Sequence, residues 1–328
     1  MLALPDGELI AALAGKRQAE IERDLRSLDL AHLRERAGAA GLELICRCDP
    51  AYPARLLPLE SSPAVLHVAG GLERALALLE EEVVAIVGAR RASGYGLEIA
   101  RSLGRGLVAS GLTVISGMAL GIDSAAHAGA LTAHGATVAV LPGGADKPYP
   151  SSRRALYNRI VATGAILSEL PAGAAVRRWA PPARNRIIAA LATMTVVVEA
   201  RPRSGALVTA AWARELDHQL GAIPGRVTSE LAAGPNGLIR AGATLIESAQ
   251  DVLDELFGEG AVKCSDRMRP PLGEDLERLL AAIGAGHDTL ATLTRKGFGA
   301  EQVLAGLSEL ELMGYLRRGP GSRFEVVP

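Results

Sequence analysis

The chain of 328 residues is poor in aromatic residues and has no long apolar run, and each shortage excludes something. Aromatics make up 3% of the residues, so the core has to be aliphatic, as is typical of α/β sheets covered by helices. No uncharged apolar stretch reaches the ~18 residues that mark a membrane helix, and the N-terminus lacks the pattern of a secretory signal. We expect a cytoplasmic protein with no membrane span, long enough for more than one domain.

Cysteine is scarce as well, with three residues in the chain. Cys46 and Cys48 form a C-x-C pair, and Cys264 has no Cys or His partner at zinc-ligand spacing. We expect reduced thiols of structural role and no metal site.

Lysine supplies only four of the 35 basic residues, so clustered arginine is more informative than abundant arginine. Six arginines fall between Arg177 and Arg203 against one acid, Glu199, although the formal net charge of the chain is −1. The pattern predicts a short arginine-rich helix that leads into a core strand. Guanidinium groups match phosphate oxygens, which favours a polyanionic ligand. The alternative is a solvated helix with surface ion pairs.

The pattern along the chain predicts four parts. Residues 1–60 read as a helical N-terminal module with a segment that leads into the sheet, and residues 61–258 alternate strands with amphipathic helices. A linker over 259–273 precedes a small domain at 274–328. The alternation predicts a Rossmann-like α/β domain with a parallel sheet. Its strands are expected at 83–87, 113–116, 137–141, 165–168, 195–200, 220–224 and 243–247.

Most of these predicted strands end in a turn that contains glycine or serine. Such turns meet at one edge of a parallel sheet, where ligands bind, and the helix N-termini that follow present free N–H groups to anions. The first turn, from Gly88 to Gly96, is not a dinucleotide fingerprint, because Arg90 occupies the place of the second glycine. We therefore expect no nucleotide cofactor, and a phosphate of a larger ligand beside Arg90.

Two pairs of residues could belong to a catalytic site. Asp123 and His127 share one helical face, but no Ser or Cys nucleophile in a strained turn accompanies them, which favours a structural role. Glu169 and Glu199 each end a strand and could act as general bases. The interpretation that we favour is that they order the neighbouring arginines.

Seven segments together resemble the DNA-processing protein A (DprA/Smf) family. They include VVAIVGAR, SGMALGIDSAAHAGAL, PPARNRIIAAL and VVVEARPRSGALVTAAWARE, and they cover roughly residues 52–246 in the family's order. The resemblance implies an extended Rossmann-like domain, flanked by a helical module and a C-terminal winged helix. It further implies a homodimer, without enzymatic turnover, that binds and protects single-stranded DNA and helps to load RecA during natural transformation.

The resemblance also implies which residues bind the single strand. One departure concerns the aromatic residue that the family places directly before a proline, because that position is Pro181 here; Trp179 could provide the stacking face instead. The expected binding residues are Gly88, Arg90, Arg91, Ser116, Gly117, Arg178, Trp179, Arg184, Asn185, Arg186, Ser204 and Gly205.

The expected recognition helix of the winged-helix domain, at 300–313, holds three glutamates and no lysine or arginine. A helix that reads the major groove needs cations and amides, so we expect a protein contact or a weak accessory DNA surface instead.

Two other functions remain open at this stage. The Pro142-Gly143-Gly144 turn is similar to that of phosphoribohydrolases acting on nucleotide phosphates, but it lacks their Gly-Thr and glutamate. A scaffold with a structural anion is the other possibility.

Overall fold

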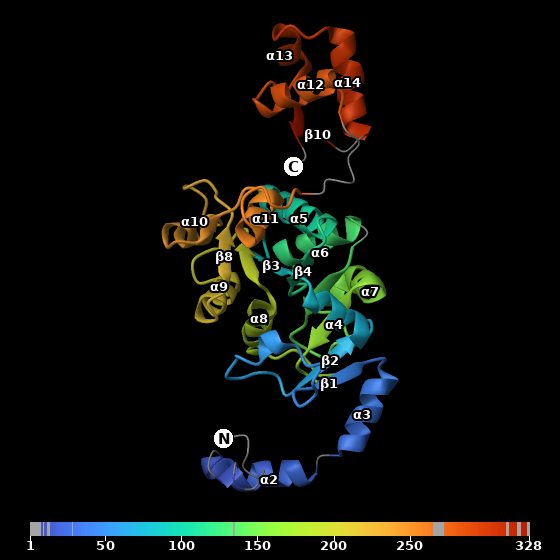
Figure 1. Cartoon of the computed structure of the whole chain (residues 1–328), viewed down its shortest axis with the longest axis vertical. Helices are drawn as coiled ribbons and strands as arrows, with labels where there is room; N and C mark the ends of the chain where they lie inside the picture. The colour runs from blue at the N-terminus through green and yellow to red at the C-terminus, as the bar shows by residue number, and fades with distance from the viewer. Residues whose placement is uncertain are drawn as a thin grey trace.

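The computed structural model comprises a central sheet domain with a helical module at one end and a small domain at the other (Figure 1). The residues that it describes are 8, 10, 11, 14–27, 29–133, 135–264, 272–312, 315–319 and 323–326.

The central domain is built on a nine-stranded sheet of order β1-β2-β6-β5-β4-β3-β7-β8-β9. The seven strands from β6 to β9 in this order are parallel, whereas β2 runs antiparallel to β6, and β1 antiparallel to β2. The strands are β1 (Glu43–Cys46), β2 (Val65–Ala69), β3 (Val83–Val87), β4 (Thr113–Ser116), β5 (Thr137–Val140), β6 (Ala165–Ser168), β7 (Met194–Val197), β8 (Gln219–Ala222) and β9 (Thr244–Leu245).

Helices cover both faces of this sheet because its strands are apolar on both sides. In β3, Val84 and Ile86 pack towards α5, α6 and α11, while Val83 and Val87 pack towards α4, α8 and α9. The helices of the domain are α4 (Leu72–Glu80), α5 (Gly94–Ala109), α6 (Ile122–Thr132), η3 (Ser151–Arg153), α7 (Arg154–Thr163), α8 (Ala180–Leu191), α9 (Gly205–Glu215), α10 (Ala233–Arg240) and α11 (Ala249–Phe257).

The flanking parts are smaller. The N-terminal module contains η1 (Gly15–Arg17), α2 (Gln18–Arg26) and α3 (Leu30–Ala39), and η2 (Ala54–Leu56) lies between β1 and β2. The C-terminal domain packs three helices against a hairpin around Leu279, Leu293 and Leu307, which is a winged-helix arrangement. Its elements are α12 (Glu274–Gly284), α13 (Leu290–Arg295), α14 (Ala300–Leu312), β10 (Leu316–Gly319) and β11 (Arg323–Val326).

The predicted fold class is confirmed, with differences at element ends. The strand predicted at 195–200 ends at Val197, and the one predicted at 243–247 contains only Thr244 and Leu245. The sheet also begins before the boundary predicted at residue 60, because β1 pairs with β2. Among the described helices, none has the length and apolar character that a membrane crossing requires.

Candidate functional site

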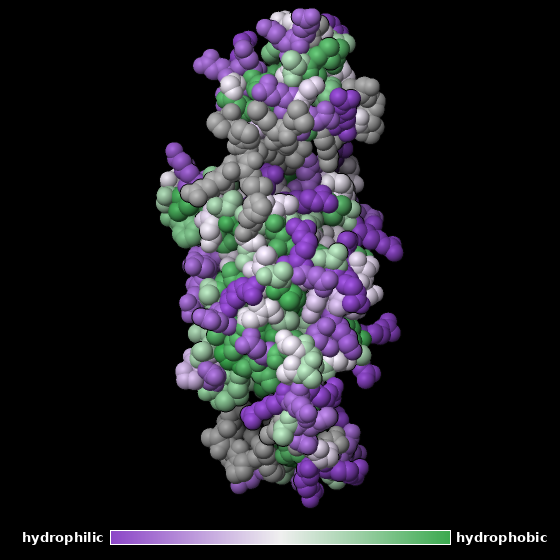
Figure 2. All heavy atoms as spheres, turned by 90° about the vertical axis from the view of Figure 1, so that its right-hand side faces the viewer, coloured by the Kyte–Doolittle hydropathy of each residue, from purple (hydrophilic) through white to green (hydrophobic). Residues whose placement is uncertain are grey.

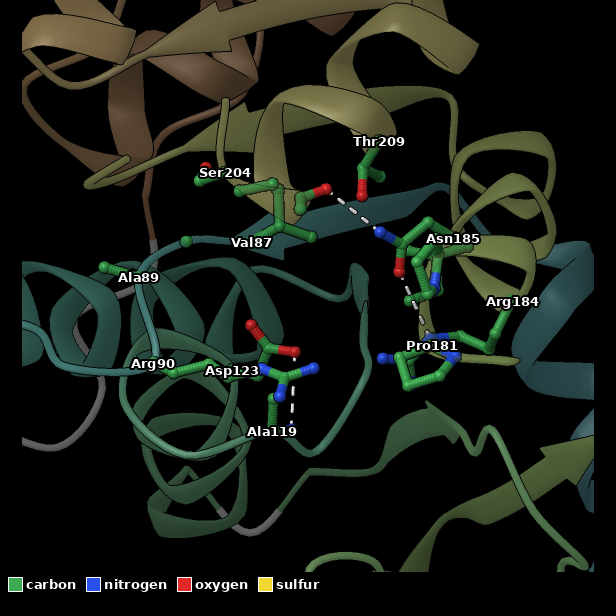
Figure 3. Close-up of a pocket in the computed structure, with 15 residues that line it drawn as sticks. Val87, Ala89, Arg90, Ala119, Asp123, Pro181, Arg184, Asn185, Ser204 and Thr209 are labelled. Carbon is green, nitrogen blue, oxygen red and sulfur yellow. Dashed lines mark hydrogen bonds between the residues drawn. The ribbon is translucent and has the colours of Figure 1, made fainter. Parts of the chain in front are cut away.

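A cavity of about 250 Å³ lies where the strand order of the sheet reverses. From β3 the chain builds outwards through β4, β5 and β6, and then returns to place β7 on the other side of β3. Loops that leave β3 and β7 therefore diverge to opposite faces and leave a crevice at the carboxyl ends of the strands. Gly88, Arg90, Asp123, Arg184 and Ser204 are among the residues that line the cavity (Figure 3).

The N-terminus of α9 forms one wall of this cavity. Ser204 is its N-cap residue, but its side chain makes no capping hydrogen bond, and the buried Oγ has no partner among the described residues. Ser93 in the equivalent place on α5 does cap its helix, because its Oγ accepts from the amide of Gly96 at 3.1 Å. An unpaired hydroxyl beside the positive end of a helix is a suitable place for an anion.

Arg184 lines the cavity and is held in place by Gly117. The Arg184 Nη1 donates to the carbonyl of Gly117 at 2.8 Å and also to the carbonyl of Val140. The amide of Gly117 in turn donates to Asp123 Oδ2 at 3.2 Å. A Cβ at residue 117 would lie 2.3 Å from Arg184 Nη2, so only glycine fits at this position. The predicted Ser116-Gly117 turn thus binds the guanidinium group of Arg184 through the carbonyl of Gly117.

Burial shifts the pKa values of two charged residues that line the cavity, Arg184 and Asp123. It lowers the pKa of Arg184 to about 10, which still leaves the guanidinium charged at neutral pH. Burial raises the pKa of Asp123, and the nearby Arg184 opposes that rise. Arg184 is therefore a permanent cation of the site, and the carboxyl group of Asp123 accepts its hydrogen bonds from within the protein.

Asn185 fixes α9 relative to α8. Its Nδ2 donates to the carbonyl of Gly205 at 3.0 Å, and its Oδ1 accepts from Arg184 Nε at 3.3 Å. Asn185 therefore positions the α9 N-terminus beside Arg184. Space alone does not require glycine at residue 205, because an added Cβ would have only Asn185 Nδ2 within contact, at 3.9 Å.

Four predicted binding residues lie exposed around the cavity. Arg90 and Arg91 belong to the loop after β3, and Arg178 and Trp179 directly precede α8, whose first residues, including Pro181, line the cavity. The Trp179 side chain is 59% exposed. Among the described residues, neither Arg90 nor Arg91 has a hydrogen-bond or ion-pair partner. These groups are available to a ligand.

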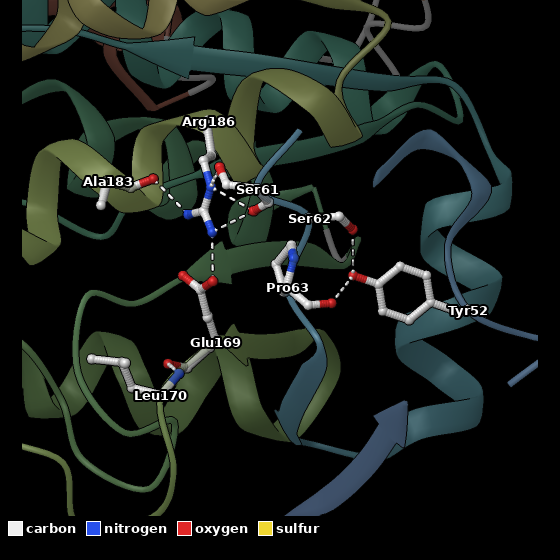
Figure 4. A network of polar contacts seen from close by, with 9 residues as sticks. Tyr52, Ser61, Ser62, Pro63, Glu169, Leu170, Ala183 and Arg186 are labelled. Atoms are coloured by element: carbon white, nitrogen blue, oxygen red, sulfur yellow. Dashed lines mark hydrogen bonds and ion pairs between the residues drawn. The ribbon is translucent and has the colours of Figure 1, made fainter. Parts of the chain in front are cut away.

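Arg186, in contrast, is buried and has internal partners (Figure 4). Its Nη2 donates to Glu169 Oε1 at 2.5 Å and to the carbonyl of Ser61 at 2.8 Å, and its Nη1 donates to the carbonyl of Ala183 at 2.8 Å. This network joins α8, the loop after β6 and the segment that leads into β2. Glu169 therefore orders an arginine, as predicted. Arg186 was expected to bind the DNA strand, but its guanidinium donates to partners within the protein, so we assign it a structural role.

Two further expectations need correction. Ser116 is fully buried, and its Oγ donates to the carbonyl of Ile86 at 2.6 Å, so this hydroxyl faces the sheet. Glu199 does not order an arginine: it accepts from the amide of Ser93 at 2.9 Å and from Ser93 Oγ at 2.5 Å. Its carboxylate holds the loop that carries Arg90 and Arg91.

The buried Asp123 and His127 do not form a catalytic pair. His127 Nδ1 lies 2.9 Å from Thr137 Oγ1, whose hydroxyl donates to the carbonyl of Val114, while Asp123 accepts from the backbone. Burial, with a further contribution from Arg184, lowers the pKa of His127 to about 3, so its ring is neutral at physiological pH. The structural interpretation of both residues is supported.

The arrangement is therefore suited to holding an anion. The two hydroxyls that line the cavity, from Ser204 and Thr209, have no histidine beside them in the lining. Among the residues that the structure describes, no cluster of three His, Cys, Asp or Glu side chains could hold a metal ion.

Comparison with known proteins gives consistent relatives. Residues 43–257 match the family model described as DNA recombination-mediator protein A, and residues 265–322 match the DprA winged helix domain. Protein Smf of Synechocystis is 35% identical over 316 residues, which cover 84% of this chain and 78% of that one. Protein Smf of Escherichia coli is 34% identical over 281 residues, or 82% and 74% of the two chains.

Solved structures agree with this. DNA processing protein A from Streptococcus pneumoniae superposes with a TM-score of 0.70 at 34% identity and covers 77% of this chain and 87% of that one. DNA processing protein A from Helicobacter pylori, whose single-stranded DNA binding mode has been described, superposes with a TM-score of 0.59 at 27% identity over 66% and 97% of the two chains.

Proposed function

The chain belongs to the DNA recombination-mediator protein A family, and on that premise we propose that it binds single-stranded DNA in the cavity at the carboxyl ends of β3 and β7. The bound strand is protected there and passed to the RecA recombinase, as the family resemblance implies. In natural transformation, the strand would be incoming DNA.

One observation carries the proposal: Arg90, which is exposed and has no partner among the described residues, lines the same cavity as the start of α9 and the Ser204 hydroxyl, which is likewise unpaired there. A phosphodiester could accept hydrogen bonds from all three at once. Charge-assisted bonds of this kind are about twice as strong as neutral ones. Arg184 adds a fixed positive charge below the phosphate, and Arg91 and Arg178 extend the cationic surface along the backbone.

Two features favour a single strand over a duplex. Trp179 offers an exposed aromatic face beside the cavity, and base stacking contributes about 1–3 kcal/mol per base only where a base is free of its partner. The helix α14, which would enter a major groove, carries Glu301, Glu309 and Glu311 and no cation.

The remaining parts of the proposal concern the oligomeric state, the cellular location and the absence of catalysis. We propose a cytoplasmic homodimer without catalytic turnover. Leu245, on the edge strand β9, is 46% exposed, and an edge strand that presents an apolar side chain is suited to pairing with another chain. Light scattering of a Leu245→Lys variant, which should be monomeric, tests the dimer separately from DNA binding.

Binding is tested by fluorescence anisotropy of a labelled dT oligonucleotide across a range of salt concentrations. Arg90→Ala should weaken binding and reduce the slope of log K against log salt by about 0.7, the value for one lost phosphate contact on a single strand. Arg240→Ala removes an exposed arginine from α10, outside the cavity, and serves as the matched control. Equal behaviour of the two variants would contradict the proposed site.

A nucleotide hydrolase is the competing function, and the structure gives it little support. In the turn that would carry its motif, Asp146 Oδ1 accepts from the amide of Gly173 at 2.9 Å, so this carboxylate holds a loop. Incubation of the protein with nucleoside monophosphates, followed by chromatography, should release no free base. Steady base release would favour the hydrolase.

A further inference from the structure

A second cavity, of about 320 Å³, lies on the helical face beside the first and is lined by three arginines and no acidic residue. Arg101 comes from α5, Arg153 from η3 and Arg159 from α7. Figure 2 views the molecule from the side on which α6 and α7 lie in Figure 1, and hydrophilic side chains project there in several clusters. We call this cavity the α5–α7 groove.

The groove exists because α6 is recessed between its neighbours. Gly121, Ser124, Ala125 and Ala128 are the small residues through which α6 lines it. The backbones of α5 and α6 also pack at close range, since a Cβ at Gly129 would lie 2.1 Å from the carbonyl oxygen of residue 101. Longer side chains of α5 and α7 therefore form walls above a floor of small residues.

The three arginines of the groove have no visible purpose within the fold. Among the described residues, none of them has a side-chain hydrogen bond or an ion pair. The Nε of Arg153 is buried and has no partner there either. A buried guanidinium N–H without an acceptor is costly, and this one lies in a hollow that also holds the exposed guanidinium groups of Arg101 and Arg159, which indicates an anion that supplies the acceptor.

The groove is continuous with the Arg90 cavity through the N-terminus of α6. Gly121 lines the groove, and a Cβ at this residue would lie 2.1 Å from the carbonyl oxygen of Ala89 and 2.8 Å from that of Arg90. The amide of Ile122 also donates to the carbonyl of Ala89 at 3.2 Å. The loop that carries Arg90 thus rests on the same turn of α6 that begins the floor of the groove.

We propose that the α5–α7 groove is a second phosphate subsite, which holds the backbone of the same DNA strand after it leaves the Arg90 cavity. This inference rests on the proposed function of that cavity. A strand that runs from Arg90 over Gly121 would bring successive phosphates to Arg101, Arg153 and Arg159. The groove would thereby lengthen the bound segment without reading its sequence, because it offers guanidinium groups and no aromatic face.

The test uses the full chain and 5′-labelled dT oligonucleotides of increasing length, with anisotropy measured across salt concentrations. The groove variant is Arg101→Ala with Arg159→Ala, since both side chains are exposed and their removal leaves the packing intact. The matched control is Arg154→Ala with Arg240→Ala, which removes two exposed arginines that do not line the groove.

The groove variant should bind the shortest oligonucleotides as the wild type does. Beyond a threshold length it should bind more weakly, with the salt slope reduced by about 1.4, or two contacts at 0.7 each. Arg90→Ala should weaken binding at every length. An unchanged slope in the groove variant at every length, or an equal loss in the control, would overturn the second subsite.

The two proposals fail in different ways. If the wild type binds the shortest oligonucleotides and Arg90→Ala abolishes that binding while the groove variant has no effect at any length, the cavity is the only site. If Arg90→Ala has no effect but the groove variant does, the groove binds a strand and the proposed cavity does not. A loss confined to duplex of the same length would overturn the assignment of the groove to a single strand.

Discussion

Replacement of Arg186 by alanine separates structure from binding within the Arg-Asn-Arg segment. The side chain is 8% exposed and donates to Glu169, to Ser61 and to the carbonyl of Ala183. Truncation leaves the Ser61 carbonyl and one carboxylate oxygen without their donors. The segment that leads into β2 then loses the hydrogen bonds that Arg186 makes from α8 to Ser61.

The magnitude follows from the exposure of the partner. Breaking a fully buried ion pair costs about 3–5 kcal/mol, but Glu169 is 32% exposed and can be rehydrated when Arg186 is removed. The loss of charge-assisted hydrogen bonds then dominates, and we expect a destabilisation of about 2–3 kcal/mol. For a domain of this size, that corresponds to a fall in Tm of roughly 4–12 °C.

Thermal unfolding monitored by circular dichroism measures this shift. Arg154→Ala, an exposed arginine on α7 without a partner among the described residues, should change Tm by little. Arg186→Lys should recover only part of the loss, because an ammonium cannot reproduce the fork of donors. At a temperature where Arg186→Ala is folded, its affinity for dT should match that of the wild type. A variant with unchanged Tm and lost DNA binding would refute the structural assignment.

Three other perturbations have defined outcomes. Gly117→Ala should displace the Arg184 side chain, with a loss of about 1–3 kcal/mol in unfolding free energy and weaker dT binding in the same protein. An unchanged Tm would contradict the close approach of Arg184 to the backbone of Gly117. His127 has a folded-state pKa of about 3 against 6.5 for the free side chain, so the unfolded chain binds the extra proton and stability falls as pH drops from about 6.5 towards 3. His127→Gln should remove up to ~1.4 kcal/mol per pH unit of that dependence in urea unfolding at several pH values, and an unchanged pH dependence would contradict the assignment to His127. Trp179→Ala should lower dT affinity by about 1–3 kcal/mol without changing the salt slope, and Trp179→Phe should retain most of it; a changed slope would indicate a phosphate contact instead.

The sequence was sufficient for the parallel strands and for the edge that carries the site, but it did not place β1 and β2 in the sheet. Strands such as β3, β4 and β6 are short, fully buried runs followed by glycine- or serine-containing turns, and their bounds are those predicted. The position of Arg90 in the first turn could likewise be predicted from the sequence, because the residue occupies the place of a fingerprint glycine.

Side-chain partners far apart in sequence could not be predicted. Arg184 and Arg186 are the same residue type two positions apart, but Arg184 contacts Gly117, 67 residues away, and Arg186 contacts Ser61, 125 residues away. Glu199 was expected beside arginines on its own loop and instead meets Ser93, because β7 lies next to β3 in the sheet. The α5–α7 groove was missed for the same reason, since its arginines come from three elements and form no motif.

The most direct test of the account is a nuclear magnetic resonance titration of the isotope-labelled protein with a dT oligonucleotide, which follows the backbone amides. The predicted result is large shifts for Gly205 and Ala206 at the start of α9, which are lost in Arg90→Ala, with no comparable shifts in α14. Shifts that map to α14 and leave the start of α9 unchanged would contradict a single-strand site at the carboxyl ends of β3 and β7.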